Sequence, residues 1–113
     1  MSHYKTFLLP TNKGKEFIVA DKIIRIEACS NYSKLFFKDG TTLVVAKVLH
    51  WFENKLSPTD FIRVHRSHLI NIIYIERYNR GCTIMLNDNS FFTIAKRKQT
   101  SVKKFLQNAL TAC

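Results

Sequence analysis

Three short segments of the chain carry side chains suited to binding a polyanion. They are residues 30–34 (SNYSK), 63–68 (RVHRSH) and 96–98 (KRK), and each lies beside an apolar run. Lysine and serine contact phosphate oxygens, whereas arginine can bind O6 and N7 of guanine with both arms and asparagine can do the same with adenine. Together the three segments favour a nucleic acid as the ligand.

The overall charge points in the same direction. The 113 residues include 18 Lys and Arg against 8 Asp and Glu, which gives a formal net charge of +10. A surplus of this size on a small body creates a field that attracts polyanions. On charge alone, an anionic membrane surface and an acidic protein partner stay open as alternatives.

The residues that an enzyme or a metal site needs are scattered. His65 and His68 are three residues apart, and on one strand they would lie on opposite faces, which does not suit a metal pair. Cys29, Cys82 and Cys113 are odd in number and far apart, so they predict neither a disulfide framework nor a zinc site. Paired carboxylates, a nucleophile elbow and a glycine-rich phosphate loop are all missing from the sequence. We therefore expect no enzyme, no metal and no cofactor.

The sequence also bears on location. No stretch reaches the ~20 consecutive apolar residues that a membrane helix requires. The start, MSHYK, lacks the apolar core of a signal peptide. With unpaired cysteines, these features predict a reducing cytoplasm and no membrane contact.

Short apolar runs broken by polar pairs predict one mainly β domain. Asp39-Gly40 is a strong hairpin signal, because glycine adopts positive φ freely. Residues 87–89 (NDN) predict a second polar turn. The predicted strands are residues 4–9, 16–20, 23–28, 34–38, 41–45, 61–64, 70–78, 82–86 and 91–95.

The hydrophobic spacing becomes helical in two places. Between residues 46 and 56 one face of a short helix is expected to hold Val45, Val48, Leu49, Phe52 and Leu56. Ser57-Pro58 ends it, because the residue before proline avoids the α region. The tail helix follows Thr100 or Ser101, either able to cap it, and its core-facing residues are Val102, Phe105, Leu106, Ala109 and Leu110.

Three motifs occur in order, IEACSNYS at 26–33, FIRVHRSHLIN at 61–71 and IAKR at 94–97. Their order and spacing resemble the LytTR DNA-binding domain, whose pattern is roughly I-x-A-x-x-N-Y, F-x-R-V-H-R-S-x-L-V-N and a terminal S-R-R-like element. The resemblance covers about Ile23 to Leu110, and its middle motif is the most specific. The chain departs from the pattern at Ala95, where the family often has Ser, and at Lys96, where Arg is common.

The resemblance implies a mainly β fold over residues 1–113, an elongated stack of small antiparallel sheets with one or two short helices. It implies sequence-specific binding of double-stranded DNA by loops in successive major grooves, often as two copies on direct repeats. Such domains form the output half of bacterial response regulators, behind a receiver domain. The base contacts then fall on Ser33 or Lys34, Arg66 and Arg97. Backbone-contacting or loop-shaping roles fall on Asn31, Tyr32, His65, Ser67, Lys96 and Lys98.

Other polar residues have structural interpretations. Asn71 follows an apolar run and is predicted to satisfy backbone groups at a strand joint. Arg25, Arg77 and Arg80 are predicted to be ordinary surface charges. Arg63 either decorates a solvated strand face or serves the second segment.

Two further functions stay open. Nine Phe and four Tyr could offer stacking platforms to RNA or single-stranded DNA, although the runs at 35–37 and 91–92 favour core positions for most Phe. An antagonist that pairs with full-length regulators would instead form a complex without binding DNA.

We expect a monomer in solution that pairs on DNA, because no large apolar face is left over. Leu110 and the tail helix are the alternative dimer contact.

Overall fold

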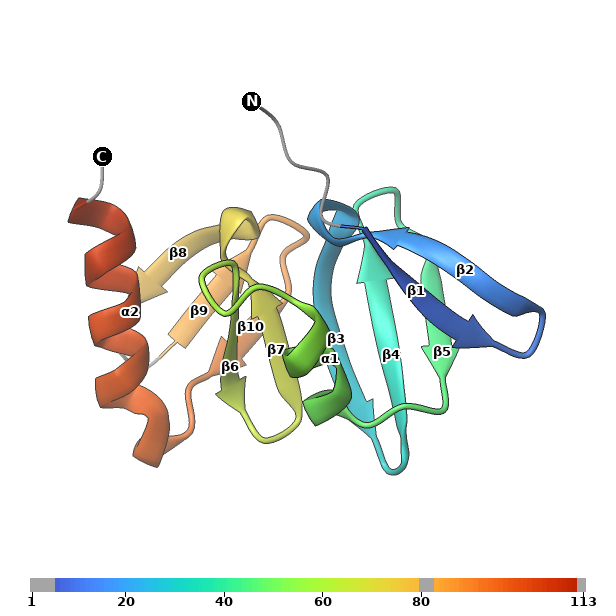
Figure 1. Cartoon of the computed structure of the whole chain (residues 1–113). Helices are drawn as coiled ribbons and strands as arrows, with labels where there is room; N and C mark the ends of the chain where they lie inside the picture. Colours follow the sequence, from blue (N-terminus) through green and yellow to red (C-terminus); the bar gives the residue numbers. More distant parts are fainter. Residues whose placement is uncertain (1–5, 80–82, 112–113) are drawn as a thin grey trace.

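Three small antiparallel sheets and two α-helices make up the part of the chain that the structure describes (Figure 1). The structure, a computed structural model, describes residues 6–79 and 83–111, without the side chains of 109–111. The mainly β stack of small sheets is confirmed. The predictions made for Tyr4, Arg80, Cys82, Cys113 and the side chains of Ala109 and Leu110 lie outside the described residues.

The strands group into a hairpin, a central sheet and a smaller sheet. The hairpin pairs β1 (Thr6–Thr11) with β2 (Gly14–Val19). The five-stranded sheet has the order β5-β4-β3-β7-β6, with β3 (Ile23–Cys29), β4 (Tyr32–Phe37), β5 (Thr42–Val45), β6 (Phe61–His65) and β7 (His68–Asn71). The three-stranded sheet has the order β10-β9-β8, with β8 (Ile75–Asn79), β9 (Thr83–Leu86) and β10 (Phe91–Thr93).

The five-stranded sheet lies between two hydrophobic cores, because successive side chains of a strand point to opposite faces. On β7, Leu69 belongs to one core and its neighbour Ile70 to the other. The first core packs that sheet against the β1–β2 hairpin and helix α1 (Leu49–Lys55). The second packs it against the three-stranded sheet and helix α2 (Gln99–Thr111) (Figure 1). The two cores fix the loops at the ends of the central strands.

Helix α1 is shorter than its hydrophobic pattern suggested. Val45, Leu49, Phe52 and Leu56 are buried as predicted. Val48, predicted on the same face, is 50% exposed. The reason is that Val48 is the extended N-cap residue, with ψ 162°, so its side chain is outside the helical register. The face begins one turn later than expected.

The single strand predicted over residues 70–78 is wrong. β7 ends at Asn71, a 3₁₀ turn (Ile72–Tyr74) follows, and β8 begins at Ile75 in the other sheet. The apolar run is continuous because both sides of the crossover are buried. Asn71 makes the joint: its Nδ2 donates to the Ile23 carbonyl at 3.0 Å, and its Oδ1 accepts from the Ile73 amide at 3.2 Å. The structural interpretation of Asn71 is confirmed.

Replacing Asn71 should therefore cost stability. Asn71→Ala leaves the buried Ile23 carbonyl without its side-chain donor, and an unmet buried polar group costs about 1–3 kcal/mol. Urea unfolding followed by circular dichroism measures the change. Asn79→Ala removes an exposed amide instead and should stay within about 0.5 kcal/mol of the parent protein. Equal losses from the two substitutions would contradict the role of Asn71.

The tail helix begins earlier than its predicted caps. A 3₁₀ turn, η3 (Lys96–Lys98), leads directly into α2 at Gln99, so Thr100 and Ser101 lie in the first turn and cap nothing. Ser101 Oγ instead donates to the Lys98 carbonyl at 3.1 Å. Val102 and Leu106 are buried in the second core, which confirms the packing role of this helix for its described side chains.

Candidate nucleic-acid interface

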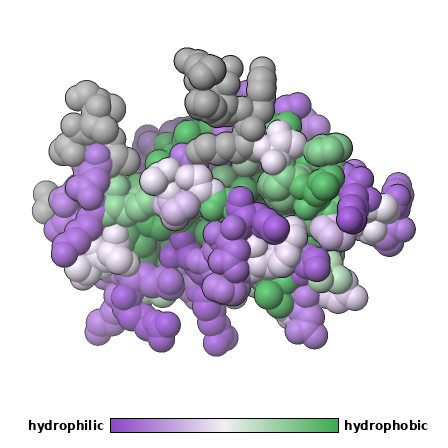
Figure 2. All heavy atoms as spheres, viewed as in Figure 1, coloured by the Kyte–Doolittle hydropathy of each residue, from purple (hydrophilic) through white to green (hydrophobic). Residues whose placement is uncertain are grey.

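The three segments singled out in the sequence meet at one edge of the molecule. They are the β3–β4 turn (residues 29–32) with the start of β4, the β6–β7 turn (residues 65–68), and η3. The Ala28 amide donates to the Ser67 carbonyl at 2.8 Å, which joins the first segment to the second. The Ala95 amide donates to the Val64 carbonyl at 3.0 Å, which joins the third to β6. The segments line the lower edge in Figure 1, where hydrophilic residues gather in Figure 2.

In the first segment the structure separates Ser33 from Lys34. Ser33 is fully buried, and its Oγ donates to the Lys47 carbonyl at 2.6 Å. The prediction of a base contact at Ser33 therefore does not fit, because its hydroxyl faces inward and holds the segment that leads into α1. Lys34 is half-buried, with its Nζ 5.2 Å from the Phe36 ring centroid. Asn31 and Tyr32 are exposed at the turn.

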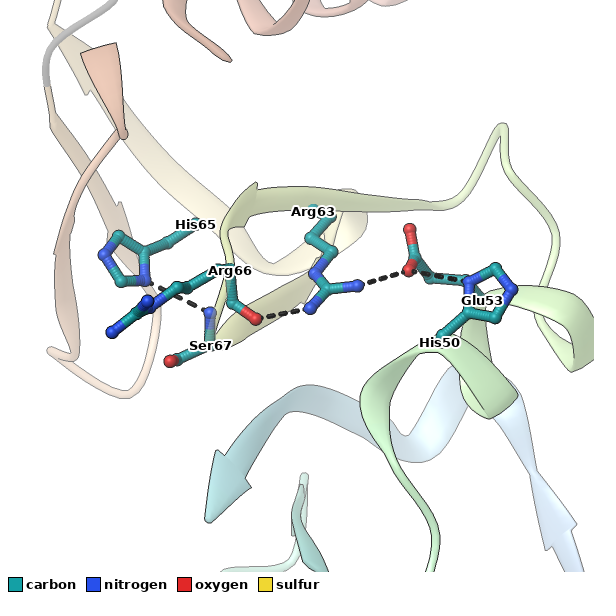
Figure 3. A network of polar contacts seen from close by, with 6 residues as sticks. All are labelled: His50, Glu53, Arg63, His65, Arg66 and Ser67. Carbon is teal, nitrogen blue, oxygen red and sulfur yellow. Dashed lines mark hydrogen bonds and ion pairs between the residues drawn. The ribbon is translucent and has the colours of Figure 1, made fainter. Parts of the chain in front are cut away.

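The second segment exposes Arg66 at the tip of a tight turn. The Ser67 amide donates to His65 Nδ1 at 3.1 Å, so His65 shapes this turn (Figure 3). His65 and His68 were expected on opposite faces, but they are cross-strand partners whose ring centroids are 5.5 Å apart. The expectation failed because it placed both on one strand, whereas the chain reverses between them.

His68 packs against an aromatic residue of β10. Its ring lies 4.8 Å from that of Phe92. Burial lowers the pKa of His68, and nearby Glu27 partly offsets this by favouring the charged form. The lowered pKa favours the neutral ring, which packs from β7 against Phe92 of β10.

The third segment presents the basic run from a 3₁₀ turn. Lys96 and Arg97 are exposed and Lys98 is half-buried. An open groove of about 620 Å³ separates this segment from the Arg66 turn. The groove is lined by His65, His68, residues 91–96 and Gln99. Phe91, expected in the core, is 62% exposed beside it, because on the short strand β10 only Phe92 faces inward.

Two arginines have roles that sequence reasoning missed. Arg25 was expected at the surface, but its guanidinium carbon lies 3.6 Å from the Phe36 ring centroid and its Nη1 bonds Glu27 Oε1 at 3.0 Å. Arg63 bonds Glu53 on α1 and the backbone of the Arg66 turn. Alternation with apolar neighbours was the available signal for both, but it does not reveal a partner on another strand or helix.

Two negative findings concern residues 6–79 and 83–111. This part of the chain has no group of three or more His, Cys, Asp and Glu side chains that could hold a metal ion. Within the same ranges, no helix has the length and apolar character needed to cross a membrane.

A small basic β domain that gathers cationic turns along one edge has the architecture of a nucleic-acid-binding module. The family model described as the LytTr DNA-binding domain matches residues 14–107. The chain therefore belongs to the LytTR family of DNA-binding domains.

Individual relatives agree with the family. The Sensory transduction protein LytT of Bacillus subtilis (strain 168) is 27% identical over 110 residues, which cover 93% of this chain and 46% of that protein. The chain thus spans about half the length of this curated relative. A solved LytTr DNA-binding domain, from a Bacillus cereus protein described as a methyl-accepting/DNA response regulator, has the same fold. Its TM-score is 0.75 at 19% identity, with 93% of this chain and 98% of that chain covered.

Proposed function

We propose that the three segments bind successive major grooves on one side of a DNA duplex and read its sequence. The observation that carries the proposal is that Arg66 and Arg97 are both exposed on the same edge, each next to a residue, His65 or Lys96, that lines the groove. Arginine is the side chain that most often reads guanine, because its planar donors match O6 and N7. Two such groups on separate turns can reach separate base pairs.

The residues of the three segments then have different roles in binding DNA. Lys34, Arg66 and Arg97 contact bases. Lys96 and Lys98 contact phosphates, and Asn31, Tyr32 and Ser67 shape the loops or contact the DNA backbone. Because His65 Nδ1 accepts the Ser67 amide, the proton of neutral His65 is on Nε2, which can donate to a phosphate oxygen. These roles make the chain a binding module and not an enzyme.

The wider assembly follows from the same proposal. Two copies on a direct repeat, spaced by about one helical turn of ~34–36 Å, would place equivalent segments on one side of the duplex. The chain would act in the cytoplasm as the output half of a longer regulator, behind a receiver domain. In support, the match to the curated relative LytT covers only 46% of that protein, which leaves room there for a further domain.

Single substitutions should separate base contacts from phosphate contacts. Arg66→Ala and Arg97→Ala should each lower the preference for the best site by about 1–3 kcal/mol, or roughly 5- to 150-fold, because a two-armed contact is lost. Lys98→Ala should weaken every duplex about equally. Fluorescence anisotropy with matched and mismatched duplexes at one salt concentration measures both effects.

The same assay distinguishes the other functions. Unchanged site preference in both arginine variants would contradict the assignment of base contacts. Single-stranded DNA or RNA that competes as well as the duplex would instead favour a stacking module. An antagonist would bind a full-length regulator and show no affinity for any duplex.

A further inference from the structure

A chain of polar contacts ties helix α1 to the turn that carries Arg66 (Figure 3). Arg63 Nη1 donates to Glu53 Oε1 at 2.7 Å, and Nη2 of the same guanidinium donates to the Arg66 carbonyl. The side chains of Arg63 and Glu53 are only 25% and 32% exposed. A planar guanidinium held at both ends is a stiff link, because its donors keep a fixed geometry.

The Arg63 link holds the backbone of the turn and leaves the Arg66 guanidinium free. In Figure 3 the Arg66 guanidinium points away from Arg63, while the Arg66 carbonyl faces it. The next residue is held twice more: the Ser67 amide donates to His65, and the Ser67 carbonyl accepts from Ala28. The position from which the Arg66 side chain leaves the turn is therefore fixed from several sides.

The geometry argues against Arg63 as a DNA contact of its own. Both of its terminal nitrogens are engaged by partners within the protein. It also neutralises Glu53, whose carboxylate would otherwise repel a polyanion at this edge. His50 Nδ1 lies farther from the same Glu53 oxygen, at 3.7 Å, and its side chain is 74% exposed, so Arg63 is the main partner.

We infer that Arg63 and Glu53 are positioning residues that set where Arg66 meets the DNA and so tune sequence discrimination. The inference rests on the proposed function, in which Arg66 reads a base. It extends the interface inward to a helix that does not itself need to touch the duplex.

The first test is a double-mutant cycle on DNA binding. Arg63→Gln and Glu53→Gln should each lower the preference for the best site over a duplex changed at the Arg66 base pair by about 3- to 30-fold. Arg63→Lys should recover part of this, because lysine can reach only one of the two partners. In an Arg66→Ala background, Arg63→Gln should have almost no effect on preference. Arg77→Gln removes the same charge from an exposed site on β8 and is the control.

The opposite pattern would overturn the inference. If Arg63→Gln weakens all duplexes equally, with or without Arg66, then Arg63 is a charge or a phosphate contact and not a positioning residue. A parent protein with no site preference would overturn the proposed function. It would also overturn the role of the Arg63 link in sequence discrimination.

A second measurement tests, without DNA, the Arg63 link between helix α1 and the turn that carries Arg66. Amide hydrogen exchange followed by nuclear magnetic resonance should show the Ser67 amide exchanging at least about tenfold faster in Arg63→Gln and Glu53→Gln than in the parent, because the turn is released. Amides in β9, on the other sheet, should be unchanged. Unaltered exchange at the Ser67 amide in both variants would show that the Arg63 link does not hold the turn, whatever the DNA experiments give.

Discussion

Raising the salt concentration from 50 to 200 mM should weaken binding of two copies to a direct repeat by about 10³- to 10⁵-fold. Each copy presents a cluster of cations on the proposed DNA-facing edge, namely Lys34, Arg66, Lys96, Arg97 and Lys98. With five such cations in each copy, whether they contact bases or phosphates, two copies neutralise roughly 6–10 phosphate charges and release condensed counterions from the duplex. Anisotropy titrations at several salt concentrations give the slope of log affinity against log salt.

Substitutions of single lysines test which part of the surface causes this salt dependence. Lys98→Ala should reduce the slope by about one for each bound copy, because one phosphate contact is lost. Lys38→Ala is the control: Lys38 is exposed and follows the end of β4 opposite to the Tyr32 end, away from the interface. A slope near zero, or equal changes from both variants, would contradict electrostatic binding at this edge.

Phe52→Ala should destabilise the domain by about 3–5 kcal/mol. Phe52 is fully buried in the first core, with its ring edge-on to Trp51 at 5.0 Å and to Phe7 at 6.3 Å. It thereby joins α1 to strand β1. Domains of this size have only about 5–15 kcal/mol of total stability, so the variant should lose a large share of it. Urea unfolding monitored by tryptophan fluorescence and circular dichroism measures the loss.

The matched control is another phenylalanine. Phe17 lies on the outer face of the β1–β2 hairpin and is 76% exposed, opposite Leu8. Phe17→Ala should change stability by less than about 0.5 kcal/mol. A small loss at Phe52, comparable with that at Phe17, would mean that α1 is not held to the sheet as described.

The secondary structure could be predicted largely from local patterns. Alternation located most strands, and Asp39-Gly40 marked a hairpin in which Gly40 has φ 88°. The crossover at Asn71 could not be predicted, because β7 and β8 are both apolar and the sheet to which each belongs depends on distant partners. Asn71 was nevertheless recognisable as a joint, since a buried amide must bond to backbone groups.

The three candidate segments could be located in the sequence, but the contacts that hold their side chains could not. Motif order identified all three segments, because each follows or joins a recognisable strand. The burial of Ser33 depends on the Lys47 carbonyl, which comes from another part of the chain. The Arg63 link depends likewise on Glu53, ten residues earlier on a helix. Such long-range pairs have no sequence periodicity, so they become visible only in the folded molecule.

The most direct test of sequence-specific binding is selection from a random duplex library, with the parent protein and Arg97→Ala compared side by side. The parent should enrich one motif, arranged as a direct repeat spaced by about one helical turn, and Arg97→Ala should lose preference at one position of that motif. No enriched motif, with binding only at low salt, would contradict sequence reading and leave charge as the only basis of binding.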